Sequence, residues 1–439
     1  MSPARSRRTS STRCRARCVR SSRNSGYAGT DFARASAPAP AVAARSRSPV
    51  SVAVPLRSTV VDVDLDAIAA NLVALRNRGG GEVIAVVKDD AYGHGVEAVA
   101  ETLAEAGAAM LAVFTVEEAL VIRRAGITAP VLVLSGATDR AEAEAAVAAD
   151  CALVVWDLEG ARLIDEAAAA AGRTARVHFK VDTGLTRLGA PAAEAPARLA
   201  RLRELRHLEV EGLFTHLATA DEADVSGDRA QLARFADVLS AIPTPPRWIH
   251  AAASAGVAAL GPVPGCNAIR PGVSLYGLHT APHLAAALAL RPALEWRSRV
   301  RRVAAVPKGT GVSYGLEYRL PQGGRVATVP VGYGDGLPRA LGRRGRVLLG
   351  GRALPFAGRV AMDLVMLDVT ELPATREGDE VVVIGAQGTA RQTADDLAMA
   401  VGTISYEILV GIRRRVPRRY HRGGRVVAMR TLADGYRRL

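Results

Sequence analysis

A lysine stands at the end of a run of five apolar residues, in the segment EVIAVVKDDAYGHG (82–95). The run, 83–87, follows three glycines and predicts a strand buried on both faces, as in a parallel sheet. A lysine at a strand end is usually left in water. In a partly apolar pocket, however, burial lowers the pKa of an amine, which then serves as a base or a Schiff-base former. Lys88 is therefore the first candidate catalytic residue.

Other polar side chains end or follow later apolar runs. Taken singly, each has a simple structural explanation: His216 as a hydrogen-bonded structural histidine, Arg187 as one half of a surface ion pair. If the runs are strands of a parallel barrel, however, all these groups meet at the C-terminal rim, where barrel enzymes place their active sites. The set comprises Lys180, Arg187, His216, His250, Ser254, Arg270 and Gly272.

The loops after the last two strands are where such barrels commonly bind phosphate, and Ser254 and glycine-flanked backbone amides are available there. A lysine at the mouth, a phosphate site and an arginine between them suit an aldehyde cofactor with a phosphate group. Pyridoxal 5'-phosphate (PLP) has both features. The spacing of the sequence shows no paired metal-ligand pattern, and we expect no metal.

The elements that must position these groups alternate along the chain. Eight short apolar runs are separated by Ala-rich helical segments. This alternation is typical of an α/β fold with a parallel (β/α)8 TIM barrel. One helix, 115–125, opens with the capping pattern Thr115-x-x-Glu118. Further helices are expected at 157–171 and 227–241. The strands are expected at 83–87, 110–113, 131–134, 152–155, 176–181, 209–214, 247–250 and 266–269.

After about residue 291 the helical segments give way to short β-rich segments punctuated by glycine, such as GRVATVPVGYGDG. This pattern of short β-rich segments and glycines predicts a second, mainly antiparallel β domain. We therefore expect a disordered basic tail at 1–57, a PLP-binding barrel at 58–290 and a C-terminal β domain at 291–439. An early strand at 58–64 could join the β domain.

The net charge of +14 belongs mostly to the tail. Residues 1–57 contain twelve arginines and one acid, Asp31, which gives +11 and leaves +3 for the other 382 residues. The tail lacks apolar periodicity and should be disordered. We favour an inert extension or a start codon placed too far upstream. An organelle-type targeting peptide and an arm for nucleic acid or anionic surfaces stay open.

The four cysteines show no paired metal-ligand pattern and are interpreted as free thiols in a reducing compartment. The most apolar uncharged window, 251–269, is interrupted by Gly and Pro, so no membrane span is expected. We therefore expect a cytoplasmic protein that binds neither nucleic acid nor a membrane.

With these residues in view, the chain resembles the alanine racemases of the barrel-type (fold type III) PLP enzymes from residue 61 to about 420. The segment AVVKDDAYGHG is similar to the cofactor-lysine signature of that family. The other matching segments occur in the family's order: HFKVDTGLTRLG, THLATADE, IRPGVSLYGL, GVSYG, PVGYGDG, GRVAMD and TISYE.

The resemblance implies that Lys88 links to PLP and acts as the base on the D-alanine face. Tyr314 of GVSYG would be the opposite base, supplied by the second subunit of a homodimer. Two bases are reasonable, because racemisation removes the Cα proton from one face and returns one to the other. Free lysine and tyrosine lose their protons only near pH 10, so the site must favour their deprotonated forms.

The remaining roles also come from the resemblance. Arg270 would donate a hydrogen bond to the pyridine nitrogen and leave it unprotonated, with His216 supporting the arginine. Arg187 would approach the cofactor phenolate and the substrate carboxylate, and Lys180 occupies a position that some members carbamylate. The phosphate would be bound by Tyr92, Ser254, Gly272 and Tyr406, and the substrate also by Met362 and Asp363.

Three positions depart from the family pattern. Asp89 follows the lysine where a small residue is usual; it could raise the basicity of the amine, but we favour an exposed residue at a helix start. Ala253 replaces an asparagine and removes one phosphate contact unless water substitutes. Ala361 occupies a variable position. The expected activity is alanine racemisation for peptidoglycan supply, with a racemase of serine, lysine or another amino acid, or a non-catalytic PLP-binding protein, as alternatives.

Overall fold

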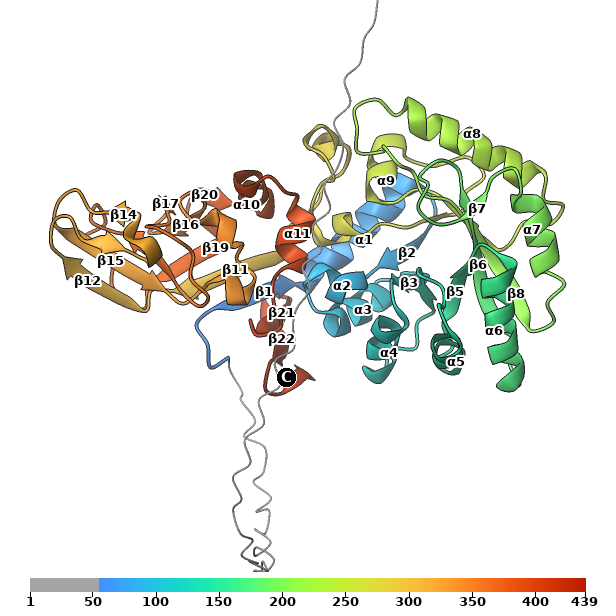
Figure 1. Cartoon of the computed structure of the whole chain (residues 1–439), viewed down its shortest axis with the longest axis horizontal. Coiled ribbons are helices and arrows are strands. Elements are labelled where there is room, and N and C mark those ends of the chain that lie inside the picture. Colours follow the sequence, from blue (N-terminus) through green and yellow to red (C-terminus); the bar gives the residue numbers. More distant parts are fainter. Residues whose placement is uncertain (1–54) are drawn as a thin grey trace, which may run out of the picture. The chain divides into compact units, whose positions relative to one another are not determined.

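The computed structural model describes residues 55–439 (Figure 1). Eight parallel strands form a closed barrel in the order β5-β4-β3-β2-β10-β9-β8-β6, and β5 pairs with β6 to close the ring. The predicted barrel is therefore confirmed. Its strands are β2 (Glu82–Val86), β3 (Met110–Val113), β4 (Val131–Val133), β5 (Ala152–Val155), β6 (Ala175–Asp182), β8 (Leu208–Phe214), β9 (Trp248–His250) and β10 (Ala268–Ile269).

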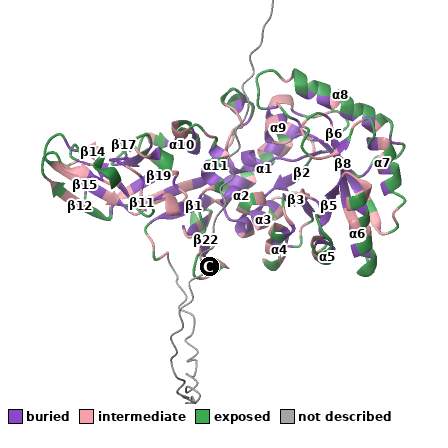
Figure 2. Cartoon of the chain, viewed as in Figure 1, coloured by how far each residue is buried: buried purple, intermediate pink, exposed green. Residues whose placement is uncertain are grey.

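The barrel strands match the apolar runs to within two residues at each end. They are almost entirely buried because the barrel interior faces one side and helices cover the other. Figure 2 shows the buried residues along the strands and exposed residues on helices such as α6 and α8. The helices are α1 (Leu65–Gly79), α3 (Val96–Glu105), α4 (Val116–Arg124), α5 (Arg140–Ala148), α6 (Leu158–Ala170), α7 (Ala195–Leu202), α8 (Ser226–Ser240) and α9 (Ser254–Leu260).

The capping box predicted for α4 is present. The Thr115 side chain accepts from the backbone N–H of Glu118, and the Glu118 carboxylate accepts from the N–H of Thr115. Asp157 caps α6 in a similar way, by accepting from the N–H of Gly160. These caps satisfy amide groups that a helix start leaves without partners.

The second domain is mostly antiparallel, as predicted. Its large sheet has the order β17-β16-β19-β11-β1-β21-β22-β23, with β20 beside β19, and only β1 and β21 in it are parallel. The strands are β1 (Val60–Asp64), β11 (Leu294–Arg299), β16 (Arg346–Leu349), β17 (Arg352–Pro355), β19 (Glu380–Gln387), β20 (Ala390–Gln392), β21 (Arg418–Arg422), β22 (Arg425–Thr431) and β23 (Gly435–Arg438).

The early strand β1 pairs with β11 and β21 and not with the barrel. Two smaller sheets complete the domain: β12 (Arg302–Val306) with β15 (Gly324–Val329) and β18 (Val365–Asp368), and β13 (Gly311–Val312) with β14 (Tyr318–Arg319). Helices α10 (Ala394–Val401) and α11 (Ser405–Val410) follow β20, and a short strand β7 (Ala190–Pro191) pairs in parallel with the end of β6.

Most of the predicted tail lies outside the described residues, which begin at Pro55. Its last residue, Arg57, forms an ion pair with the fully buried Asp335. In residues 55–439, no helix is long and apolar enough to cross a membrane. Cys151 is buried and Cys266 is half-buried, and both are free thiols.

Candidate active site

A cavity of about 1010 Å³ opens at the C-terminal ends of the barrel strands. Nine of the thirteen predicted site residues line it, together with apolar groups such as Phe114 and Leu217. The barrel therefore brings these residues together, although they are up to 318 positions apart along the chain, from 88 to 406. The nine are Lys88, Tyr92, Lys180, Arg187, His216, Ser254, Arg270, Gly272 and Tyr406.

Lys88 begins a left-handed turn, α2 (Lys88–Tyr92), instead of an ordinary helix. The four residues after it, 89–92, have φ values of 54°, 57°, 55° and 53°. For residues other than glycine, such a conformation costs roughly 1–2 kcal/mol each. The predicted exposure of Asp89 is confirmed, but the residue does not start an ordinary helix, because its backbone is left-handed. Asp89 Oδ2 lies 2.9 Å from Lys88 Nζ.

Two arginines of the β domain hold this strained turn. Arg430 forms a two-pronged ion pair with the Asp90 carboxylate at 2.6 and 2.7 Å, and the Asp90 carboxylate also accepts from the N–H of Val96. The fully buried Arg418 donates to the carbonyl of Gly93 at 3.0 Å. These contacts offset the strain and connect the lysine turn with the β21–β22 hairpin.

One end of the cavity has the features of an anion site. The Ser254 hydroxyl accepts from the backbone N–H groups of Gly272 at 2.9 Å and Ser274 at 3.3 Å. A Cβ on Gly272 would lie 2.4 Å from the Tyr92 hydroxyl, so only glycine fits. The rings of Tyr92 and Tyr406 lie 6.0 Å apart, and burial raises the pKa of both phenols, which therefore stay protonated.

Arg270 lies buried on the barrel side of the cavity. Its Nη1 donates to Nδ1 of His250 at 2.6 Å, and its Nη2 donates to Nδ1 of His216 at 2.8 Å and to the carbonyl of Thr215 at 3.1 Å. Burial lowers the pKa of Arg270 to about 10, so the guanidinium stays charged at neutral pH. Burial and the charge of Arg270 lower the pKa of His216 to about 2, which keeps this histidine a neutral acceptor.

Two of the buried groups behind Arg270, His178 and Glu211, were not predicted from the sequence, whereas His250 was expected at the rim and lies buried behind the arginine. His178 Nδ1 lies 3.0 Å from His250 Nε2, and His178 Nε2 lies 3.3 Å from Glu211 Oε1. Because an arginine only donates, His250 must accept at Nδ1, and therefore carries its proton on Nε2. His178 then accepts at Nδ1 and donates from Nε2 to Glu211. The sequence did contain a feature that could have predicted His178 and Glu211, because both are polar residues inside apolar strand segments.

Lys180 ends β6 beside Arg187. Lys180 is buried, and its Nζ lies 5.7 Å from the centre of the Phe214 ring. Burial and the charges of Arg270 and Arg187 lower the pKa of the Lys180 amine to about 8. Arg187 is exposed at the cavity wall and forms no ion pair with the part of the chain that the structure describes. Its charge is available to a ligand.

Tyr314, Met362 and Asp363 lie outside the cavity, on loops of the β domain. The side chains of Tyr314 and Met362 are 71% and 53% exposed. Their loops are in contact, because the Ser313 hydroxyl donates to the carbonyl of Arg359 at 2.8 Å. The segment GYGDG holds the second loop, with the N–H of Gly334 donating to the carbonyl of Met362 at 2.8 Å.

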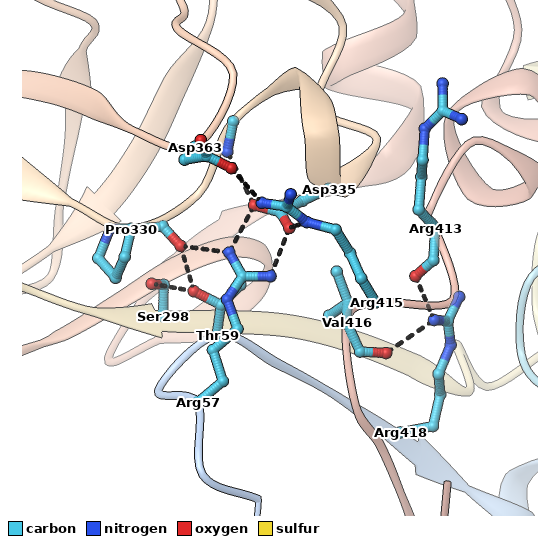
Figure 3. Close-up of polar contacts among 11 residues, drawn as sticks. Arg57, Thr59, Ser298, Pro330, Asp335, Asp363, Arg413, Arg415, Val416 and Arg418 are labelled. Carbon is cyan, nitrogen blue, oxygen red and sulfur yellow. Dashed lines mark hydrogen bonds and ion pairs between the residues drawn. The ribbon is translucent and has the colours of Figure 1, made fainter. Parts of the chain in front are cut away.

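Asp335, in the GYGDG segment that holds the Met362 loop, has a fully buried side chain (Figure 3). It accepts from both terminal nitrogens of Arg57, from Nε of Arg415 at 2.7 Å and from the N–H of Gly332 at 3.0 Å. Arg415 also donates to Asp363 at 2.5 Å. Burial alone would raise the pKa of Asp335, but the hydrogen bonds from Arg57 and Arg415 hold it below its usual value.

Residues 55–439 contain no group of three or more His, Cys, Asp or Glu side chains placed to bind a metal ion.

Comparison with known proteins agrees with this geometry. Residues 63–280 match the family model described as alanine racemase, N-terminal domain, and residues 293–420 match the model for the C-terminal domain. The alanine racemase of Symbiobacterium thermophilum is 44% identical over 370 residues, which cover 83% of this chain and 97% of that protein. That of Halothermothrix orenii is 41% identical over 371 residues, with the same coverage.

Solved structures give the same result. The alanine racemase of Bacillus anthracis with bound L-Ala-P has a TM-score of 0.80 and 38% identity, and the match covers 86% of this chain and 99% of that one. The alanine racemase of Streptomyces lavendulae has a TM-score of 0.78 and 38% identity, with 84% and 98% covered. Both domains are matched, and the chain therefore belongs to the alanine racemase family of enzymes.

Proposed function

We propose that the chain interconverts L-alanine and D-alanine with PLP as cofactor and with two bases, Lys88 and Tyr314 of a second subunit. The observation that supports this function most directly is that Lys88, Arg270 and Ser254 line the same cavity. A reaction at an amino-acid Cα that inverts configuration needs a proton donor and acceptor on each face.

The residues of the cavity fit PLP. The Lys88 amine at the mouth of the cavity can react with an aldehyde, and the Ser254 hydroxyl and the two protonated phenols can donate hydrogen bonds to a phosphate. Ala253 makes no side-chain contribution to this cradle, so one anion contact fewer is available. The Thr280 hydroxyl, buried in the cavity wall without a partner in the described residues, offers a further polar contact.

When bound, PLP supplies an aldehyde that joins covalently to amines and a conjugated ring that makes an attached amino acid's Cα proton acidic. Lys88 Nζ removes or returns that proton on the D-alanine face. The Tyr314 hydroxyl does the same on the opposite face. Two aromatic rings lie beside Lys88, with the ring centres of Tyr92 and Phe114 at 5.9 and 6.0 Å from Nζ.

Arg270 places a positively charged hydrogen-bond donor at the inner end of the cavity. Its guanidinium donates hydrogen bonds but does not deliver a proton, because it stays charged at the working pH. Arg270 would hold the ring nitrogen of PLP by a hydrogen bond and would leave that nitrogen unprotonated, because an arginine only donates. His216 and His250 hold the planar guanidinium in place from two directions.

Substrate binding is assigned to charged and backbone groups at the rim. Arg187 would bind the alanine carboxylate, and a carbamate on Lys180 would hold Arg187 from behind. Met362, through its backbone N–H, and Asp363 would complete the substrate site from the second subunit. The Asp335 cluster then serves as the support of the Met362 loop.

The position of Tyr314 supports a homodimer, because this side chain is exposed and does not line the cavity of its own chain. Leu316, Met362 and Leu364 on the same loops are also exposed, by 52%, 53% and 37%. Exposed apolar side chains around a candidate base are typical of an interface. The product D-alanine would supply peptidoglycan synthesis, and we place the reaction in the cytoplasm.

The proposal is tested with purified protein, PLP and alanine in deuterated water. The wild type should exchange the Cα hydrogen of alanine and show the visible absorbance of lysine-bound PLP. Lys88→Ala should lose both. Lys308→Ala removes an exposed lysine that does not line the cavity, so this variant should keep the hydrogen exchange and the absorbance. Absence of exchange in the wild type would overturn the proposal.

A further inference from the structure

Arg418 is a fully buried arginine that takes no direct part in the proposed chemistry. It lies on β21 in the second domain, and all five N–H groups of its guanidinium donate to backbone carbonyls. Burial and the charge of Arg430 lower its pKa to about 10, so the group stays charged at neutral pH. Hydrogen bonds from a charged donor are stronger than those between neutral groups, so the segments that accept them are firmly held.

One of these segments is the turn that carries Lys88. Nε and Nη2 of Arg418 both donate to the carbonyl of Gly93, at 3.3 and 3.0 Å. Gly93 ends the left-handed turn α2, and its N–H donates to the carbonyl of Asp89 at 3.0 Å. The carbonyl that Arg418 holds is therefore fixed to the same short turn as the amine of Lys88 and the phenol of Tyr92.

The other segment follows α11, the helix that carries Tyr406. Nη2 of Arg418 also donates to the carbonyl of Ile412 at 2.7 Å. Nη1 donates to the carbonyls of Arg413 and Val416 at 2.6 and 2.8 Å (Figure 3). One guanidinium therefore connects the lysine turn with the segment that leaves α11.

The lysine turn and α11 also meet directly. A Cβ on Gly93 would lie 2.1 Å from the carbonyl oxygen of Leu409, so only glycine allows the two backbones to approach this closely. The rings of Tyr92, on the turn, and Tyr406, on α11, lie 6.0 Å apart. Because both tyrosines line the cavity, Arg418 binds the two sides of a junction between two parts of the cavity wall.

We propose that Arg418 is a positioning residue that fixes the distance between Lys88 and Tyr406, so that the two ends of PLP are held at the same time. The inference rests on the proposed function, in which Lys88 bonds to the aldehyde and Tyr406 contacts the phosphate. A ligand bound at two ends gains affinity from the second contact only when the two partners are at the right separation. Arg418 is not among the residues that line the cavity, and it acts through the backbone of the two segments.

The test compares the binding of three ligands to the full chain freed of PLP. Pyridoxal has the ring and the aldehyde without the phosphate, inorganic phosphate represents the other end alone, and PLP joins the two. Arg418→Lys keeps the positive charge, but an ammonium group cannot bind all four carbonyls that the planar guanidinium binds.

The affinity of Arg418→Lys for PLP should fall by about tenfold or more, because at least one charged hydrogen bond across the junction is lost. The affinities for pyridoxal and for phosphate should stay within about twofold of the wild-type values, since each of these ligands needs only one end of the site. Titration calorimetry measures all three affinities. A residue that merely stabilises the fold would not weaken the binding of PLP selectively.

Arg419→Lys is the matched control. Arg419 is the next residue of β21, and its guanidinium pairs with the Asp62 carboxylate at 2.7 Å. This variant should bind PLP, pyridoxal and phosphate as the wild type does. Thermal unfolding verifies that each variant is folded.

A loss of affinity that is confined to PLP supports the inference. Unchanged affinity of Arg418→Lys for PLP, or an equal loss for pyridoxal or phosphate, would overturn it. If Arg418→Lys does not fold, Arg418→Gln, whose amide still donates to two carbonyls, is measured in its place. If neither variant folds, Arg418 is a residue of the fold and the inference is likewise overturned. A wild type that binds no PLP would overturn the proposed function itself.

Discussion

Arg270 Nη1 donates to His250 Nδ1 at 2.6 Å, deep in the barrel. This contact begins a chain of hydrogen bonds in one direction, from the guanidinium through His250 and His178 to the Glu211 carboxylate. Burial lowers the pKa of both histidines, so neither competes with Arg270 for the positive charge. A cation and an anion at opposite ends of two neutral rings give the guanidinium a defined orientation.

The first prediction concerns the far end of that chain. Glu211→Ala leaves the buried N–H of His178 without an acceptor and should lower the free energy of unfolding by about 1–3 kcal/mol. Glu211→Gln keeps an acceptor oxygen and should cost less than half as much. Urea unfolding measures both. Equal losses for the two variants would contradict a proton on Nε2 of His178.

Tyr314→Phe removes only the hydroxyl of the proposed second base. Racemisation should fall by about a hundredfold or more, since general acid–base groups contribute on that scale, while PLP absorbance stays unchanged. Tyr318→Phe is the matched control: Tyr318 lies on the same hairpin, and its hydroxyl donates to Asp368 at 2.6 Å. It should keep most of its activity. Comparable activity in Tyr314→Phe and the wild type would exclude the two-base mechanism.

Carbamylation of Lys180 should depend on pH. A neutral amine adds to carbon dioxide, forms a nitrogen–carbon bond and loses a proton to become a negatively charged carbamate. Because the pKa of Lys180 is lowered to about 8, the carbamylated fraction should rise as the pH increases through about 8. Carbon-13 NMR in labelled bicarbonate detects it. Lys180→Arg should abolish the signal and Lys308→Arg should not; a signal that survives Lys180→Arg refutes the assignment.

Asp335 should contribute to stability above its folded pKa. That pKa lies below the unfolded value because Arg57 and Arg415 outweigh the effect of burial. The contribution is therefore complete above about pH 4 and is lost as the pH falls through the folded pKa. Asp335→Asn should cost about 2–4 kcal/mol at pH 7, below the usual range for buried pairs because both arginines are partly exposed.

The measurement is urea unfolding at pH 7 and at pH 3. The difference between the wild type and Asp335→Asn should shrink at the lower pH. Asp363→Asn, which removes an exposed partner of Arg415, should cost less than about 1 kcal/mol at either pH. A difference for Asp335→Asn that does not change with pH would show that the carboxylate charge is not responsible.

Hydrophobic patterning predicted the barrel well, because each strand is buried on both faces and therefore appears as a short continuous apolar run. The polar residues that end those runs could be assigned to one rim for the same reason. The weakest strand prediction, 266–269, exceeds β10 (Ala268–Ile269) by two residues, since pairing there is limited to a short contact with β2 and β9.

Long-range ion pairs explain what the sequence could not predict. The left-handed turn after Lys88 contains no glycine at 89–92 and depends on Arg430, 340 residues away from Asp90. Asp335 likewise depends on Arg57, at a separation of 278 residues. The scarcity of lysine was a usable signal, because two of the three lysines lie in the cavity.

The most direct test of the central claim, one site built from Lys88 of one chain and Tyr314 of another, is subunit complementation. Inactive Lys88→Ala and Tyr314→Phe proteins are dissociated, mixed in equal amounts and allowed to reassociate. Half of the dimers should be mixed, and each mixed dimer has one complete site, so activity should return to about one quarter of the wild-type value. If both bases act within a single chain, the mixture will stay as inactive as its components, and the account will be contradicted.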